Sequence, residues 1–370
     1  MRFFSYPSKG EMSEKVMHRI STVISQGQFI GGVEVAMFEK SFATYTGASD
    51  TVTCGNGLDA LSLALQNIQL PNGSRVAVSG HTFFATWLAI LNAGHVPVGV
   101  DADLVNLQMN PQQLRETLRL KNIQAVVYVH MHGILGEIEE IAGICTEFSV
   151  PLIEDCAQAH GLRSASKHVG TFGEYGAFSF YPTKNLPALG DGGAVISDKH
   201  GLEIVRSRAN YGWLANNRDK HEILGVNSRL DSIQAAILNV HLEYLESLNA
   251  CRKWIAEQYL EVISGSKLIN SIDSEAKSVW HHFPIRVENR LNFIEFMKRR
   301  DIPVQIHYLI PCHLQPAFLE SQKEMEDTDN LKNVEEISRT IVSLPLHPWL
   351  TEEEIRLVVD SLRDWTSQRD

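Results

Sequence analysis

A single lysine stands between an aromatic run and a glycine-rich loop. Lys184 follows the strand-like residues 177–181 and precedes a loop at residues 190–193 that contains three glycines. A lysine at the end of a buried strand is partly desolvated, which lowers its pKa and suits its amine for Schiff-base chemistry. Taken alone, Lys184 would be interpreted as an exposed loop residue, so its interpretation depends on the groups that accompany it.

A carboxylate ends another strand-like run. The apolar residues 151–153 lead into Glu154 and Asp155, which places both carboxylates at the carboxyl edge of a sheet, where α/β proteins bind ligands. A buried Asp155 could pair with a protonated ring nitrogen and keep the ring in the cationic form that accepts electrons. It could also cap the next helix, or join Glu154 and His160 around a cation. Because no oxygen-rich loop surrounds these residues, we expect no metal site.

A glycine turn at residues 54–57 could bind a phosphate. Gly55 and Gly57 let the backbone approach an anion closely, and the helix that starts here offers free N–H groups. By itself, such a turn more often does no more than open a helix. Together with Asp155 and Lys184 it is explained by one cofactor, pyridoxal 5′-phosphate, which needs a phosphate site, a partner for its ring nitrogen and an amine for its aldehyde.

The elements that must position these groups alternate along the chain. Residues 13–46 carry apolar side chains at helical spacing and predict an N-terminal helical arm. From residue 51 onward, short apolar runs alternate with helical patterns, which implies parallel strands joined by crossover helices. We therefore predict an α/β fold whose mixed, mostly parallel sheet is flanked by helices. The expected strands are 75–79, 96–100, 125–129, 151–154, 177–181 and 193–197, and the expected helices 57–68, 83–93, 111–120 and 137–148.

The pattern changes in the last third of the chain. A long helical pattern at residues 230–263 connects the sheet to a smaller part. We predict a large domain at residues 1–249, which holds the cofactor, and a smaller C-terminal α+β domain at residues 250–370. Beyond the long helix, the expected elements are strands at 279–287 and 302–307, a helix at 291–300, and a last helix opened by a capping box at 351–354.

Composition and charge argue against several classes of protein. The 370 residues carry a formal net charge of −11 without a long run of Lys or Arg, which argues against a nucleic-acid-binding or membrane-surface role. No stretch approaches the ~20 apolar residues of a membrane helix, and the first residues lack the layout of a secretory signal, so we expect a cytoplasmic protein. The five cysteines contain no Cys-x-x-Cys pair and are expected to be reduced and mostly buried.

Several motifs follow one another in a recognisable order. Between about Phe29 and Leu350 the chain resembles the DegT/DnrJ/EryC1/StrS family of sugar aminotransferases, which are fold-type I pyridoxal-phosphate enzymes. The matching stretches are Phe29-Ile30-Gly31-Gly32-x-Glu34-Val35, Asn56-Gly57-x-Asp59-Ala60-Leu61, His81-Thr82-Phe83, Glu154-Asp155-x-Ala157-Gln158-Ala159-His160-Gly161, Phe178-Ser179-Phe180-Tyr181-Pro182-x-Lys184-Asn185, Gly190-Asp191-Gly192-Gly193-Ala194, Asn227-Ser228-Arg229-Leu230-Asp231, and His307-Tyr308 with Pro311-x-His313.

The resemblance implies a role for each matching residue. Lys184 is expected to carry the cofactor and move protons, and Asp155 to pair with the ring nitrogen. The other expected cofactor contacts are Phe83 stacked on the ring, Gln158 at its phenolic oxygen, and Gly57, Leu58, Ser179 and a second subunit's Asn227 around the phosphate. Because one contact comes from a partner, the resemblance implies a homodimer with shared active sites.

The resemblance also implies an activity. Such an enzyme moves an amino group from L-glutamate to a nucleotide-linked keto-sugar, and the motifs look most like those of enzymes acting on a dTDP-linked 3-keto-6-deoxyhexose. Tyr211, Tyr308 and His313 are the residues expected to touch the sugar nucleotide. Amination at the fourth carbon or of an aminocyclitol stays open, as does a non-catalytic cofactor-binding regulatory protein. A dehydratase branch carries histidine in place of the lysine, so Lys184 counts against it.

Four positions depart from the family pattern. Leu58 stands where Thr or Ser is usual, which removes one hydroxyl from the expected phosphate site and leaves the backbone N–H. Cys156 replaces Ala, Thr183 replaces Gly, and His132 stands where Tyr is common. His130 and His132 could form a metal pair on one face of a strand, although ordinary polar packing is the more common reason for such a pair. These departures concern the substrate more than the reaction.

Overall fold

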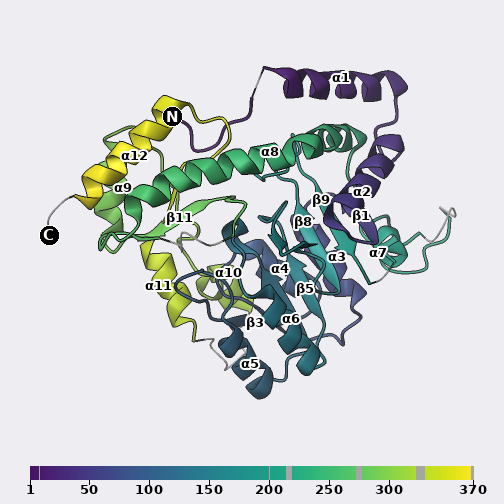
Figure 1. The fold of residues 1–370 in the computed structure, drawn as a ribbon. Helices are drawn as coiled ribbons and strands as arrows, with labels where there is room; N and C mark the ends of the chain where they lie inside the picture. The colour runs from purple at the N-terminus through teal and green to yellow at the C-terminus, as the bar shows by residue number, and fades with distance from the viewer. Residues whose placement is uncertain (8, 200, 214–218, 272–276, 322–329, 368–370) are drawn as a thin grey trace.

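A seven-stranded sheet forms the centre of the larger part of the molecule (Figure 1). The computed structural model describes residues 1–367 except 8, 200, 214–218, 272–276 and 322–329. The sheet has the order β1-β9-β8-β5-β4-β2-β3. Strands β2, β3, β4, β5 and β8 pair in parallel, whereas β9 is antiparallel to both β1 and β8. The predicted mixed, mostly parallel sheet is confirmed. The strands are β1 (Asp50–Cys54), β2 (Arg75–Ser79), β3 (Val96–Val100), β4 (Ala125–Val129), β5 (Leu152–Asp155), β8 (Tyr175–Ser179) and β9 (Gly193–Ser197).

Helices cover both faces of this sheet because alternate side chains of its strands point to opposite sides. In β2, Val76 and Val78 belong to one buried cluster and Ala77 to another. The helices of this part are α1 (Glu11–Gln26), α2 (Val33–Thr46), α3 (Gly57–Asn67), α4 (Phe84–Asn92), α5 (Pro111–Leu120), α6 (Ile138–Glu147) and α7 (Glu203–Arg208), with a 3-10 turn η1 (Met131–Gly133) and a small hairpin of β6 (Arg163–Ser164) and β7 (Lys167–His168).

The helix α8 (Ser232–Ile263) runs from the large sheet to the smaller part of the molecule, as Figure 1 shows. Near its start, Ala235 and Leu238 pack in the cluster that contains Phe180. Near its end, Ile255 and Tyr259 belong to the largest cluster, which contains Val76 of the large sheet and Phe283 of the small sheet. Residue 250 therefore lies inside a continuous helix, and a division of the chain there stays a proposal.

An antiparallel sheet in the order β10-β11-β12 forms the smaller part. One expected strand is absent from it: residues 302–307 make only a bridge between Gln305 and Ser343. Pro303 interrupts this run and has no N–H to donate to a ladder. None of the described helices has the length and apolar character of a membrane span. The elements are β10 (Asn270–Ser271), β11 (Phe283–Arg286), α9 (Arg290–Lys298), a 3-10 turn η2 (Cys312–Leu314), α10 (Pro316–Ser321), α11 (Lys332–Thr340), β12 (Ile341–Leu344) and α12 (Glu352–Thr366).

Candidate active site

The strand register brings three predicted groups to one edge of the large sheet. Because β1 and β8 are both antiparallel to β9, their carboxyl ends lie at the same edge, and Cys54 and Ser179 both stand opposite Gly193. On the other side of β8, the parallel strand β5 ends at Asp155, opposite Ala177. The turn after β1, the Ser179 hydroxyl and the Asp155 carboxylate therefore lie at the same edge of the sheet, where the sequence predicts that a ligand binds.

The turn before α3 is packed so closely that glycine is required. Asn56 caps α3, and its Oδ1 accepts a hydrogen bond of 2.9 Å from Asp59 N. A Cβ on Gly57 would stand 2.6 Å from Ser179 Cβ, and one on Gly193 would stand 2.3 Å from the Asn56 carbonyl oxygen. The first N–H groups of a helix have no intrahelical partner, so this turn offers free donors beside the Ser179 hydroxyl. The arrangement fits a phosphate group.

Leu58 contributes only its backbone to this turn. Its side chain is half-buried and packs against the largest hydrophobic cluster, which extends from the large sheet to the small one. The N–H of Leu58 belongs to the first turn of α3, where backbone N–H groups have no intrahelical acceptor. The replacement of a family hydroxyl by an apolar side chain is thus accommodated by the core.

The Asp155 carboxylate is buried and held by two donors. Thr86 Oγ1 donates to Oδ2 at 2.8 Å, and Ala157 N donates to Oδ1 at 3.0 Å. Burial raises the pKa of Asp155, and these two hydrogen bonds offset that effect only in part. A cationic ring nitrogen would stabilise the carboxylate form, so the site fits the pyridine ring of the cofactor.

Sequence reasoning assigned no role to Thr86, which follows the matching stretch His81-Thr82-Phe83 by three residues. Its hydroxyl is also 2.8 Å from Thr82 Oγ1. Thr82 and Thr86 are four residues apart, a spacing that places two side chains on one face of a helix. This spacing predicts that the two hydroxyl groups lie together, but nothing in it identifies Asp155 as their partner.

Lys184 lies half-buried in the loop that follows β8. Burial lowers the pKa of its amine to about 8, and the negative charge of Asp155 offsets part of that shift. The next residue anchors the loop, because buried Asn185 Nδ2 donates to Asn249 Oδ1 and to the Val279 carbonyl oxygen, both at 2.9 Å. A lysine with this pKa is partly neutral near pH 8, which suits it for nucleophilic attack and proton transfer.

Two aromatic side chains and an amide cover the same edge. Phe83 precedes α4 with 56% of its surface exposed, and its ring centroid is 5.4 Å from that of Tyr308. Gln158 Nε2 lies 3.4 Å from the Tyr308 hydroxyl, and Gln158 Oε1 accepts a hydrogen bond of 2.6 Å from His132 N. Burial raises the pKa of Tyr308, which keeps its phenol neutral. The large and the small parts of the molecule therefore meet at Tyr308, which lies close enough to Asp155 for the carboxylate charge to contribute to the raised pKa of the phenol.

Three other residues were predicted to belong to the site, and their contacts lie outside the group around Asp155: Tyr211, His313 and Asn227. Tyr211 is 40% exposed, and its ring lies 5.6 Å from the Arg229 guanidinium. His313 is buried, with Nε2 3.3 Å from Glu335 Oε1. Asn227 is exposed, whereas Ser228 beside it is buried and accepts a hydrogen bond of 2.9 Å from the N–H of Gly55. Their roles toward a substrate or a partner stay predictions.

Glu154, His130 and His132 all have hydrogen-bond partners within the protein. Glu154 is fully buried; it pairs with His130 Nε2 at 2.9 Å and accepts backbone N–H bonds from Gly170, Phe172 and Gly173. The possible ligand atoms of His130, Glu154 and Cys156 lie within 4.8 Å of one another, which is close enough to hold a metal ion. Both carboxylate oxygens of Glu154 already accept hydrogen bonds, however. Both histidines lie beyond the end of β4, and their rings have different partners: His130 contacts Glu154, whereas His132 contacts His81 and His282.

Comparison with known proteins agrees with this geometry. A 37% identical relative over 353 residues, covering 94% of both chains, is the dTDP-3-amino-3,6-dideoxy-alpha-D-galactopyranose transaminase of Aneurinibacillus thermoaerophilus. The solved structure of DesV from S. venezuelae has a TM-score of 0.91 at 33% identity and covers 97% of this chain and 96% of that one. NtdA from Bacillus subtilis, solved with its cofactor PMP bound, has a TM-score of 0.89 at 26% identity and covers 99% of this chain and 87% of that one.

The sequence pattern of one family covers almost the whole chain. The description of that family is DegT/DnrJ/EryC1/StrS aminotransferase, and it matches residues 11–363. The match contains the Gly57 turn, the buried Asp155 carboxylate and Lys184. The chain therefore belongs to the DegT/DnrJ/EryC1/StrS aminotransferase family, which depends on pyridoxal 5′-phosphate.

Proposed function

We propose that this protein transfers an amino group from L-glutamate to a nucleotide-linked keto-sugar, most specifically a dTDP-linked 3-keto-6-deoxyhexose. The observation that carries the proposal is the meeting of Asp155, Lys184 and the Gly57 turn at one sheet edge. The relatives named as amino-sugar transaminases support the choice of a sugar acceptor. Glutamate is proposed from the family resemblance.

In this proposal each residue of the site has a separate role in the reaction. The bound cofactor supplies an electron sink for the carbon that loses its proton. Asp155 holds a proton on the ring nitrogen, and the Gly57 turn with Ser179 anchors the phosphate. Lys184 takes the proton from the amino-bearing carbon of the donor and returns one in the second half of the reaction. Phe83 and Tyr308 cover the ring and exclude water.

The sugar-nucleotide contacts are proposed for Tyr211, Tyr308 and His313. Tyr308 has the strongest support, because its ring packs against Phe83 and its hydroxyl faces Gln158. Amination of a 4-keto nucleotide sugar or of an aminocyclitol is the competing assignment within the same chemistry. These alternatives use the same lysine and carboxylate and differ only in the acceptor.

A homodimer with shared active sites is part of the proposal. The exposed position of Asn227 supports its reaching a phosphate in a second copy. Large apolar side chains are also exposed beside it and on the N-terminal helical arm, a pattern typical of a protein interface. They are Met17, Ile24, Phe29, Ile30, Val33, Met37, Leu224 and Val226. The free thiols of all five cysteines support a reducing compartment such as the cytoplasm.

A glutamate half-reaction tests the proposal. The cofactor-loaded protein is mixed with L-glutamate in the absence of sugar, and its visible absorption is expected to give way to that of the pyridoxamine form, with release of oxoglutarate. Lys184→Ala is the control and should lack the parent visible band and the conversion. A protein that binds the cofactor but shows no conversion would be a regulatory binder, and the proposal would fail.

The same preparation identifies the acceptor. The pyridoxamine form is supplied with dTDP-linked 3-keto and 4-keto sugars in separate reactions, and return of the visible band is followed. We expect the 3-keto sugar to restore the band at least tenfold faster, because a pocket that hydrogen-bonds a substrate group discriminates strongly against a misplaced one. Faster return with the 4-keto sugar would overturn the assignment of the sugar while leaving the aminotransferase assignment intact.

A further inference from the structure

His132 has a backbone conformation that side-chain-bearing residues rarely adopt. Its φ is 61° and its ψ 3°, within the left-handed region, and its side chain is completely buried in the turn η1 after β4. A residue with a Cβ stays in this region only where its surroundings hold it there, and such residues gather at functional sites. The surroundings of His132 therefore indicate what its conformation is for.

A row of neutral imidazoles holds the side chain of His132. Its Nε2 is 3.2 Å from His81 Nε2, and its Nδ1 is 3.2 Å from His282 Nδ1. The His282 ring stacks on His307 at a centroid distance of 3.9 Å and an angle of 9°. Burial lowers the pKa of His81 to about 3 and that of His307 to about 4, so these rings are uncharged. A neutral imidazole has one donor and one acceptor, so His132 can donate to one neighbour and accept from the other.

The backbone of His132 is held from the opposite side. His281 N donates to the His132 carbonyl oxygen at 3.0 Å. The His132 N–H in turn points at Gln158 and donates to its Oε1 at 2.6 Å. The conformation of the turn therefore directs one backbone donor to one side-chain oxygen.

This contact decides which end of the Gln158 amide faces the cofactor site. A backbone N–H can only donate, so the amide oxygen must face His132. The NH2 group then points the other way, toward the Tyr308 hydroxyl at 3.4 Å. The reversed amide would place two donors against each other at His132 and an acceptor toward the cofactor.

We propose that His132 is a positioning residue: the His81–His132–His282 row fixes its left-handed turn, and its N–H orients Gln158 so that Nε2 donates to the phenolic oxygen of the cofactor. The inference rests on the proposed function, since that function supplies the cofactor. His132 itself touches neither cofactor nor substrate. It acts only through the direction of the amide.

The visible band of the cofactor-loaded protein reports this hydrogen bond. A donor to the phenolic oxygen stabilises its negative charge, so losing the donor raises the pH midpoint at which the band changes. Gln158→Leu is the reference and should raise the midpoint by about one pH unit, a tenfold change in proton affinity. His132→Ala should also raise the midpoint. The double variant should raise the midpoint no further than Gln158→Leu alone does.

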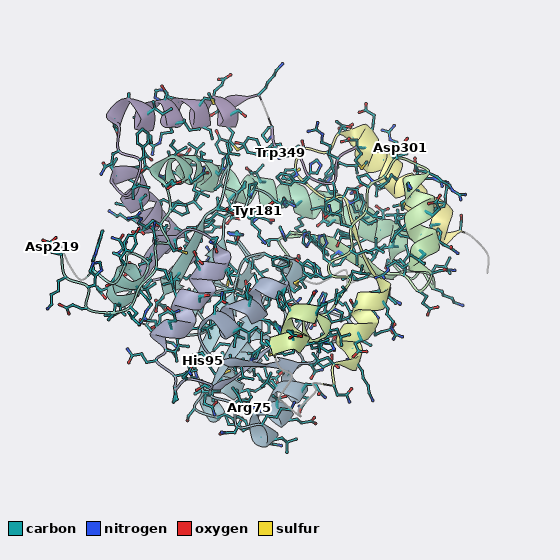
Figure 2. All side chains as sticks on the ribbon, turned by 180° about the vertical axis from the view of Figure 1, so that it is seen from behind. Arg75, His95, Tyr181, Asp219, Asp301 and Trp349 are labelled. Carbon is teal, nitrogen blue, oxygen red and sulfur yellow. The ribbon has the colours of Figure 1, made fainter. Side chains whose placement is uncertain are left out.

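Three further variants keep the test decisive. His132→Asn, whose side chain tolerates the left-handed region, should return the midpoint toward the parent value. If His132→Ala does not fold, His282→Phe removes one hydrogen bond to His132 and should give a smaller shift of the same sign. His95→Ala is the matched control, because His95 is also buried but lies before β3, and Figure 2 shows it well away from Tyr181 beside the lysine loop. The control should leave the midpoint unchanged.

Two results would overturn the inference. One is a parent-like midpoint in both His132→Ala and His282→Phe when Gln158→Leu shifts it; the other is a double variant whose shift equals the sum of the two single shifts. Either result leaves the glutamate half-reaction intact and so refutes only the role of His132. Failure of the parent protein to react with glutamate would refute the proposed function instead.

Discussion

Lys184 and Asp155 influence each other across the site in opposite directions. Burial lowers the pKa of the lysine to about 8, while the aspartate charge raises it. Burial raises the pKa of the aspartate, while the lysine charge lowers it. Each group thus supports the charged form of the other in a place where burial disfavours both charges. A change at one of them alters the protonation of the second.

The capture of cofactor by the apoprotein should follow the protonation of Lys184. Only the neutral amine attacks an aldehyde, so the initial rate at which the visible band forms should rise with pH and reach half its limit near pH 8. Asp155→Asn removes the charge that raises this pKa, so its midpoint should be lower. Stopped-flow absorbance between about pH 6 and pH 10 measures both. A midpoint near 10.5, the ordinary value of an exposed lysine, would contradict a buried amine.

At the scale of elements, the order of strands and helices could be predicted because each strand is a short apolar run and each helix has its own periodicity. Strand ends then placed Asp155 and the Gly57 turn at one edge. Two features could not be predicted in this way. The hydrogen bond from Thr86 to Asp155 and the His132 turn depend on contacts between segments far apart in sequence. The expected strand at 302–307 is absent, because Pro303 has no backbone N–H to donate to a neighbouring strand.

The junction of β1, β8 and α3 should not tolerate a single added methyl group. In Gly57→Ala the new Cβ would stand 2.6 Å from Ser179 Cβ, so the turn that we propose to bind the phosphate must move. We expect at least a tenfold weaker affinity for pyridoxal phosphate and a loss of roughly 1–3 kcal/mol in the free energy of unfolding. A cofactor titration and urea unfolding of the apoprotein measure the two effects.

Gly143→Ala is the matched control for this substitution. Gly143 lies in α6, and a Cβ there would meet nothing within 4 Å. Alanine is the better helix former by up to about 1 kcal/mol, so stability should be unchanged or higher and cofactor affinity should be unaltered. Equal effects of the two substitutions would show that the Gly57 turn has no special role.

At the scale of the whole molecule, the family and the reaction class could be inferred from sequence because their motifs are local. The homodimer that the resemblance implies stays a prediction, since an exposed Asn227 has the same appearance in a monomer and at an interface. Mixing two inactive variants separates these cases. Lys184→Ala and Asn227→Ala subunits are unfolded, combined and refolded together, and the hybrids should regain one working site for every two subunits.

The expected recovery has a simple reason. In a hybrid, the subunit that keeps Lys184 receives an intact Asn227 from its partner, whereas each parent variant lacks one of the two groups at every site. Glutamate half-reaction amplitude measures the recovery, and refolding each variant alone provides the control. A mixture that stays as inactive as its components would exclude sharing of Asn227 between subunits.

The helix α8 also limits how the molecule can move. Its 32 residues span about 48 Å and contain neither glycine nor proline. Its start is buried in the cluster that contains Phe180, and its end is buried in the cluster that joins the two sheets. Hinges form where a few backbone angles can change cheaply, and a continuous helix buried at both ends offers no such place. The small part therefore cannot swing open about this connection as domains joined by a loop do. Passage of a bulky sugar nucleotide into and out of the site must depend on loop movement and side-chain rotation at the sheet edge.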